Sequence, residues 1–255
     1  MTAHPKVTLV TCKSMPNLFK GEEGLLDELA ARGCDPQIKV WNDPDVDWSE
    51  AGMVVVRSVS DYASDRPAFL EWTKQLRRVQ NSADVLNWNT DKHYLKELAA
   101  LGMPTIPTNW LEPEQNLSKH QIHTRFPAFG EFVVKPAVSS GVRDIGRYTT
   151  VDTRQRQAAM RQVQGLLGEG RSVMIQRYVE EIDLHGEISL VFFNGLVSHA
   201  VEKRSALHPA SVSDPAVHEA VVTAEAADSV AWKWGEEIRR VLHGYVRSRL
   251  GHDEQ

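Results

Sequence analysis

A lysine stands at the end of an apolar run, shortly before a turn made of small side chains. Lys135 ends the run 132–135 (FVVK), and Ser139, Ser140 and Gly141 follow it. An ammonium group is costly to bury unless an anion accompanies it. Backbone N–H groups of a small turn can wrap a phosphate, and a nearby lysine supplies the positive charge. The residues therefore predict an anion site, although a plain hairpin with a surface lysine fits them too.

Two further lysines stand at element ends in the same module, after the boundary near Asn87. Lys92 is expected on the first turn of a helix that Thr90 caps, and Lys203 ends the run 198–203 (SHAVEK). Each taken singly fits an exposed surface lysine. Three lysines at element ends of one module are more informative together. Neither GxxxxGKS nor GxGxxG occurs, so P-loop and Rossmann fingerprints are absent.

Two other segments carry polar groups that could hold a ligand. The run 173–179 leads through an acidic link, and such a hinge can offer backbone groups to an adenine while Glu181 takes ribose hydroxyls. A solvated acidic loop fits equally. Arg57 ends the run 53–57 (MVVVR), where ligands bind open α/β sheets, and it could fork onto a substrate carboxylate or form a salt bridge. Ser58, Asp61 and Tyr62 follow it.

Metal and nucleophile signatures are weak. His120 and His123 share a predicted helical face, but no Asp or Glu completes a convincing ligand set nearby. Cys12 and Cys34 lack metal or disulfide spacing and are expected to be reduced thiols. Because that ligand set is incomplete, the sequence predicts no metal site at these histidines. There is no GxSxG motif either, so it predicts no covalent nucleophile.

The elements that position these residues change in type along the chain. Up to about Asn87, strand and helix signals alternate as in a small α/β unit with a mostly parallel sheet. Beyond it, strands dominate, and Asn194-Gly195 is the strongest hairpin signal. We expect strands over 7–11, 38–41, 53–57, 131–136, 143–150, 172–179, 187–193 and 196–203, and helices over 22–32, 65–80, 91–101, 153–167 and 231–250.

Composition sets the broad class. The 255 residues contain 29 Lys and Arg against 34 Asp and Glu, a net charge of −5. Such a chain has no excess of cations to neutralise a phosphate backbone, so nucleic acid is not an expected partner. There is no secretory signal and no apolar run of about 18 residues, so we expect a cytoplasmic protein without a membrane partner.

In this order, the segments resemble the ATP-grasp superfamily, and more closely the branch containing the O-ureido-serine cyclo-ligase of cycloserine biosynthesis. The likeness spans roughly residues 50 to 204. It rests on VVVRSVSDY (54–62), LNWNTDKHYLKEL (86–98), FVVKPAVSSGVRDIGRY (132–148), VMIQRYV (173–179), GEISLVFFNG (186–195) and SHAVEK (198–203).

The resemblance implies an ATP-grasp fold, α+β in the nucleotide clamp, preceded by a small α/β domain. It implies an N-terminal domain over 1–87, a central lid subdomain over 88–180 and a C-terminal subdomain over 181–255. Arg57, Ser58, Asp61 and Tyr62 would face the substrate, and Lys203 and Arg57 would be catalytic. The residues implied to contact ATP are Lys92, Lys135, Ser139, Ser140, Gly141, Gln176, Arg177, Tyr178, Val179, Glu181 or Glu187 for the ribose, and Lys203.

The implied function is an ATP-dependent ligase. Family chemistry phosphorylates a carboxylate, and an amine-type nucleophile then attacks it, within one molecule in the cyclo-ligase branch. ATP and a small-molecule substrate are the implied partners, and a homodimer is compatible with the family.

One departure concerns Mg²⁺. Family members hold it on carboxylates of strands that follow the last long helix, whereas this sequence ends at Gln255, and Asp253 and Glu254 are not assigned as ligands. We therefore expect a fragment that lacks its metal-binding strands. The alternatives are a truncated nucleotide-binding module without catalytic activity, and an α/β protein that binds another anion.

Overall fold

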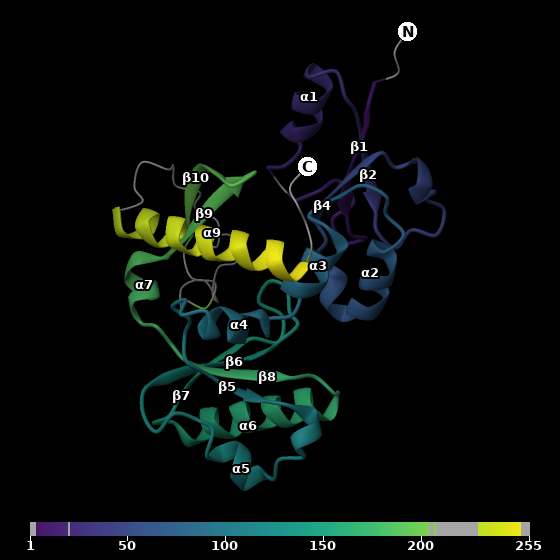
Figure 1. Ribbon diagram of the computed structural model, residues 1–255. Helices are drawn as coiled ribbons and strands as arrows, with labels where there is room; N and C mark the ends of the chain where they lie inside the picture. The colour runs from purple at the N-terminus through teal and green to yellow at the C-terminus, as the bar shows by residue number, and fades with distance from the viewer. Residues whose placement is uncertain (1–3, 20, 204–206, 208–228, 251–255) are drawn as a thin grey trace. The chain divides into compact units, whose positions relative to one another are not determined.

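The chain folds into two compact units (Figure 1). The computed structural model describes residues 4–19, 21–203, 207 and 229–250. One unit comprises Met1–Tyr94 together with Val138–Gly141, and the other comprises Leu95–Ala137 together with Val142–Gln255. The loop that carries Ser139 therefore belongs to the N-terminal unit, although it lies far along the sequence.

The N-terminal unit is built on a parallel sheet. Its strands are β1 (Lys6–Thr11), β2 (Asp35–Val40), β3 (Met53–Ser58) and β4 (Val79–Gln80), in the order β2-β1-β3-β4. Val10 and Val54 are buried in the sheet and pack with aromatic side chains. The β-branched runs produce these central strands, and the mixed α/β class predicted from the sequence is confirmed.

Short helices connect these strands or follow the last of them. They are α1 (Gly24–Ala31), two 3₁₀ turns (Trp48–Glu50 and Ser60–Ser64), α2 (Arg66–Thr73) and α3 (Ala83–Asn89). Asp65 caps α2 by accepting a hydrogen bond from the Ala68 N–H, as its position before Pro67 predicts. However, α2 ends at Thr73 instead of continuing to residue 80, because the chain turns into β4.

The helix expected to begin at Thr90 is a correction. Thr90 is the C-cap of α3, and its hydroxyl donates to the Leu86 carbonyl at 2.6 Å. The next helix, α4 (Tyr94–Ala100), begins only at Tyr94. The hydroxyl is therefore engaged with the preceding helix, and Lys92 lies in the turn between α3 and α4 instead of on a first helical turn.

The C-terminal unit contains an antiparallel sheet covered by a long helix. Strands β5 (Thr108–Leu111), β6 (Glu131–Pro136), β7 (Gly146–Thr149) and β8 (Val173–Arg177) lie in the order β5-β8-β6-β7. Helix α6 (Thr153–Gly168) packs on one face, with the short α5 (Lys119–His123) beside it (Figure 1). Phe132, Val163 and Ile175 are among the buried residues of this core.

A hairpin and the last described helix complete this unit. After α7 (Glu181–His185), strands β9 (Glu187–Phe193) and β10 (Leu196–Lys203) pair in antiparallel fashion around the predicted Asn194-Gly195 turn. Helix α9 (Ser229–Leu250) lies across the hairpin (Figure 1). A side chain at Gly235 would overlap Leu190, so glycine permits this close packing. Asp253 and Glu254 lie outside the described residues. Among the helices that the structure describes, none is long and apolar enough to cross a membrane.

Candidate functional site

A cavity of about 430 Å³ lies in the C-terminal unit beside β6 and β8. Its volume falls in the range of small-molecule sites. Lys135 reaches it from β6, and the polypeptide from Gln176 to Val179 forms another wall. The structure therefore brings together the central lysine and the hinge that the sequence singled out. The remaining lining residues are Ile106, Val133, Val142, Ile145, Ile182, Glu187 and Leu207.

Lys135 and Arg177 are both cationic residues of this cavity, and Lys135 is the one whose charge is the more strongly affected by burial. Burial lowers the pKa of Lys135, and the negative charge of Glu187 offsets part of that effect. Within the described ranges, no residue forms a hydrogen bond or ion pair with its ammonium group. A buried ammonium in such surroundings favours an anionic ligand, because the ligand would restore interactions that were lost with water.

The hinge after β8 has one backbone donor in use and one available. The Tyr178 N–H donates to the Glu131 carbonyl at 2.9 Å, which extends the pairing between β8 and β6. Gln176 is buried, and its amide donates to the Thr108 hydroxyl at 2.7 Å. No hydrogen bond of the Val179 N–H is found in the described part of the chain. Val179 can therefore donate to a ligand acceptor in the cavity.

The acidic residues near the hinge take different places. Glu187 lines the cavity, whereas Glu181 lies exposed in the first turn of α7 and is not part of the lining. Lys203 is exposed on β10 and pairs in register with Glu187 on β9. The hairpin therefore places Lys203 next to the cavity carboxylate, and Glu187 is the better placed of the two glutamates.

The N-terminal unit holds the Ser139 loop through two side chains. The Lys92 ammonium donates to the Ser139 hydroxyl at 2.7 Å and to its carbonyl at 3.1 Å. The Tyr62 hydroxyl donates to the same carbonyl at 3.1 Å. Ser139 is buried, while Gly141 adopts a φ of +62°, which glycine adopts readily. The loop, Lys92 and Tyr62 thus form one cluster, with Ser140 in the same loop.

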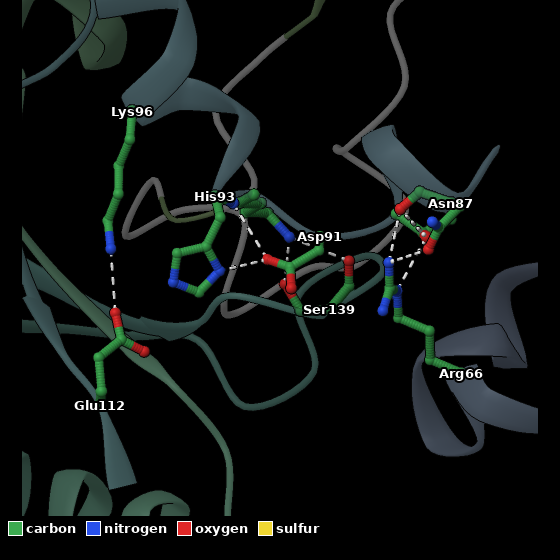
Figure 2. Close-up of polar contacts among 9 residues, drawn as sticks. Arg66, Asn87, Asp91, His93, Lys96, Glu112 and Ser139 are labelled. Atoms are coloured by element: carbon green, nitrogen blue, oxygen red, sulfur yellow. Dashed lines mark hydrogen bonds and ion pairs between the residues drawn. The ribbon is translucent and has the colours of Figure 1, made fainter. Parts of the chain in front are cut away.

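The turn that carries Lys92 is itself fixed by polar contacts (Figure 2). Asp91 accepts hydrogen bonds from the backbone N–H of His93 at 3.0 Å and from its ring at 2.6 Å. The Arg66 guanidinium donates to the Asn87 carbonyl at 2.5 Å and to the Thr90 hydroxyl at 2.9 Å. These contacts hold the turn that carries Lys92 in place, although Lys92 itself lies outside a helix.

Three of the residues implied to face the substrate have side-chain partners within the N-terminal unit. Arg57 forms an ion pair with Glu22, and the Ser58 hydroxyl donates to the same carboxylate at 2.5 Å. Asp61 accepts a hydrogen bond from the Trp41 indole at 2.7 Å. The salt-bridge interpretation of Arg57 is thus realised, and Glu22 is a residue that sequence reasoning missed. No local spacing could reveal it, because the two residues meet only through the fold.

A magnesium site does not emerge from the described residues. They contain no group of three or more His, Cys, Asp or Glu side chains arranged to hold a metal ion. Glu187 is the carboxylate that lines the cavity, whereas Mg²⁺ in phosphate sites is commonly held by one or two carboxylates together with phosphate oxygens. The described donor set does not amount to a metal site.

Comparison with known proteins decides the family. A family model described as the N-terminal domain of D-cycloserine synthetase DcsG matches residues 7–87. The cycloserine biosynthesis protein DcsG of Streptomyces lavendulae is 35% identical over 190 residues, which are 72% of this chain and 62% of that protein. The crystal structure of D-cycloserine synthetase DcsG aligns with a TM-score of 0.77 and 30% identity, covering 97% of this chain and 82% of that one.

The chain belongs to the DcsG family. The predicted resemblance to the cyclo-ligase branch is therefore confirmed. The match spans less than two thirds of the curated DcsG protein's length.

More distant structures support the fold of this DcsG family member. D-alanyl-alanine synthetase A from Vibrio cholerae aligns with a TM-score of 0.60 at 14% identity, covering 96% of this chain and 82% of that one. The ATP-grasp ligase PsnB aligns with a TM-score of 0.53 at 16% identity, covering 93% of this chain and 82% of that one. The predicted ATP-grasp fold is confirmed.

Proposed function

We propose that this protein is an ATP-dependent ligase that binds ATP in the Lys135 cavity. The observation that carries the proposal is the half-buried Lys135 ammonium, which has no described polar partner and lines the same cavity as the Val179 backbone. A lysine for phosphate and a backbone donor for a base suit the two ends of a nucleotide. Membership in the DcsG family and the ligase names of its structural neighbours support this assignment.

The proposed reaction activates a carboxylate. A substrate carboxylate oxygen attacks the γ-phosphorus of ATP, the bond to the bridging oxygen breaks, and ADP leaves. An amine-type nitrogen then attacks the acyl carbon, loses a proton and displaces phosphate. Lysines stabilise the charge that develops on the phosphoryl oxygens, so this chemistry requires no side-chain nucleophile.

Roles follow for the remaining site residues. We assign Lys135, Lys92 and Lys203 to the phosphates and the Ser139–Gly141 loop to covering them. Gln176 to Val179 would hold the base and Glu187 the ribose. Arg57, Ser58, Asp61 and Tyr62 would serve the acceptor side, with Glu22 setting the orientation of Arg57.

The substrate proposed by family analogy is a serine derivative with a ureido group. A D-cycloserine synthetase, as the relative is named, makes a ring, and ring closure needs the carboxylate and the nitrogen on one molecule. The proposed ATP-dependent ligation is therefore intramolecular.

Turnover tests both the ligation and the ring closure. Incubated with ATP, Mg²⁺ and O-ureido-serine, the full chain should release ADP and phosphate in equal amounts with a cyclic product, read by chromatography and mass spectrometry. Lys135→Met should lower kcat/KM by about 100-fold or more. ATP binding without ADP release on any tested amino-acid substrate would contradict the ligase assignment and favour a nucleotide-binding module.

A further inference from the structure

Arg147 on β7 is the centre of a half-buried polar network that the proposed chemistry does not use. Its guanidinium forms an ion pair with Glu131 on β6 and another with Asp183 on α7, the latter at 2.8 Å. Only 16% of the Arg147 side chain is exposed. Burial lowers the pKa of Arg147, but hydrogen bonds to Asp183 and Glu131 outweigh it and raise the pKa overall.

The same guanidinium holds Tyr178. It lies over the Tyr178 ring, 3.7 Å from its centre, and the Tyr178 hydroxyl donates to Asp183 at 2.5 Å. The Tyr178 N–H donates to the Glu131 carbonyl at 2.9 Å. Ring, hydroxyl and backbone of one residue are therefore all fixed by Arg147 or by its two carboxylate partners.

The network fixes the residues on either side of one wall of the cavity. Val179 and Ile182 line the cavity, and they lie in sequence between Tyr178 and Asp183, the two residues that the network fixes. The Arg147 guanidinium also donates to the carbonyl of Leu207 at 3.1 Å, and Leu207 is another lining residue. These partners of Arg147 do not include the lysines that we assign to the phosphates.

We propose that Arg147 is a positioning residue for the base of the bound nucleotide. It holds the hinge from Tyr178 to Asp183 in one conformation, so that the Val179 N–H and the apolar wall are set before the ligand arrives. Preorganisation of this kind raises affinity because the ligand does not have to order the wall. The inference rests on the proposed function, since it requires that the cavity bind a nucleotide.

The test separates the two ends of the ligand. Dissociation constants for ATP, adenosine and inorganic tripolyphosphate are measured by calorimetry on the full chain. Arg147→Met should raise the dissociation constants for ATP and adenosine about tenfold or more and leave that for tripolyphosphate within about twofold. Lys135→Met should weaken the binding of ATP and tripolyphosphate and leave the binding of adenosine unchanged.

Two further variants guard against a misfolded protein. Arg147→Lys keeps the charge but loses the planar fork and the stacking on Tyr178, so it should show the same pattern more weakly. Arg156→Met is the matched control, because Arg156 contacts His123 and Thr150 and does not line the cavity. It should bind all three ligands as the unchanged protein does.

The failures are distinguishable. If the unchanged protein binds none of the three ligands, the proposed function fails and the role of Arg147 falls with it. If the protein binds ATP, but Arg147→Met binds adenosine with unchanged affinity or loses tripolyphosphate equally, the positioning role is wrong and the nucleotide site stands.

Discussion

At the scale of single residues, the candidate site carries a cost that a ligand would remove. Lys135 is desolvated, its pKa is lowered, and Glu187 compensates only in part. Replacing a poorly compensated buried charge with an apolar side chain of similar length is often stabilising. Function and stability therefore oppose each other at this position.

The Lys135→Met variant should be more stable than the unchanged protein without ligand, by about 1 kcal/mol near pH 7. The gain should shrink as the pH rises from the lowered folded pKa towards 10.5, the ordinary lysine value. In that window the unfolded chain binds more protons at Lys135 than the folded chain does, so only the unchanged protein gains stability there. Urea unfolding of both proteins across this pH range measures the difference.

The control for this comparison is Lys119→Met, on the exposed surface of α5. Its stability relative to the unchanged protein should vary little over the same pH range, because the Lys119 side chain lies on the surface, where water screens its charge. A Lys135→Met variant that is less stable at pH 7, or whose gain grows with pH, would contradict the desolvation argument.

At the scale of elements, turns determine where the strand ends place their side chains. Gly52 precedes β3, the strand that carries Arg57 and Ser58. Its φ is +70°, and a Cβ there would lie 2.3 Å from the Lys6 carbonyl oxygen on β1. Neither the backbone conformation nor the space admits a side chain, because the clash is with main-chain atoms of the neighbouring strand.

Gly52→Ala should therefore destabilise the protein by roughly 2 kcal/mol or more, measured by denaturant unfolding. Gly24→Ala serves as the control, because nothing lies within 4 Å of a Cβ at Gly24 in α1. That change should be neutral or slightly stabilising, by up to about 1 kcal/mol. Equal effects of the two substitutions would show that the close approach at Gly52 does not matter.

Element type was predictable where the signal was local. The β-branched runs, the Asp65 cap and the Asn194-Gly195 turn each determine the conformation through nearby atoms, and the structure has all three. The prediction of a helix beginning at Thr90 was wrong because Thr90 lies at the end of the preceding helix, where its hydroxyl donates to the Leu86 carbonyl. The four-residue β5 has no clear pattern of its own and gains its partner only from β8.

The residues of the candidate site were likewise predictable only where their signal was local. Lys135 and the hinge after β8 stand out in sequence because a charged group ends an apolar strand and an acidic link follows another. Partners such as Glu22 for Arg57, or Arg147 for Tyr178, meet only after the sheets have formed. Non-local ion pairs of this kind leave no periodic or spacing signal in one sequence.

At the scale of the whole molecule, the ATP-grasp fold provides the cavity and the DcsG family suggests its use. The described chain aligns with 82% of the DcsG crystal structure, and the Lys135 cavity is contained within its C-terminal unit. Binding of the ATP phosphates at Lys135 can be tested without knowing the acceptor substrate.

The most direct measurement is labelling with an acylphosphate derivative of ATP, followed by mass spectrometry of the digested protein. A lysine amine near the phosphates attacks the acyl carbon, the phosphate ester leaves, and a stable amide remains. The lowered pKa of Lys135 favours the neutral amine that this attack needs. We predict that Lys135 is labelled and that excess ATP suppresses its labelling, while the exposed Lys119 is unaffected by ATP. A Lys135 that stays unlabelled, or is labelled equally with and without ATP, would contradict the account.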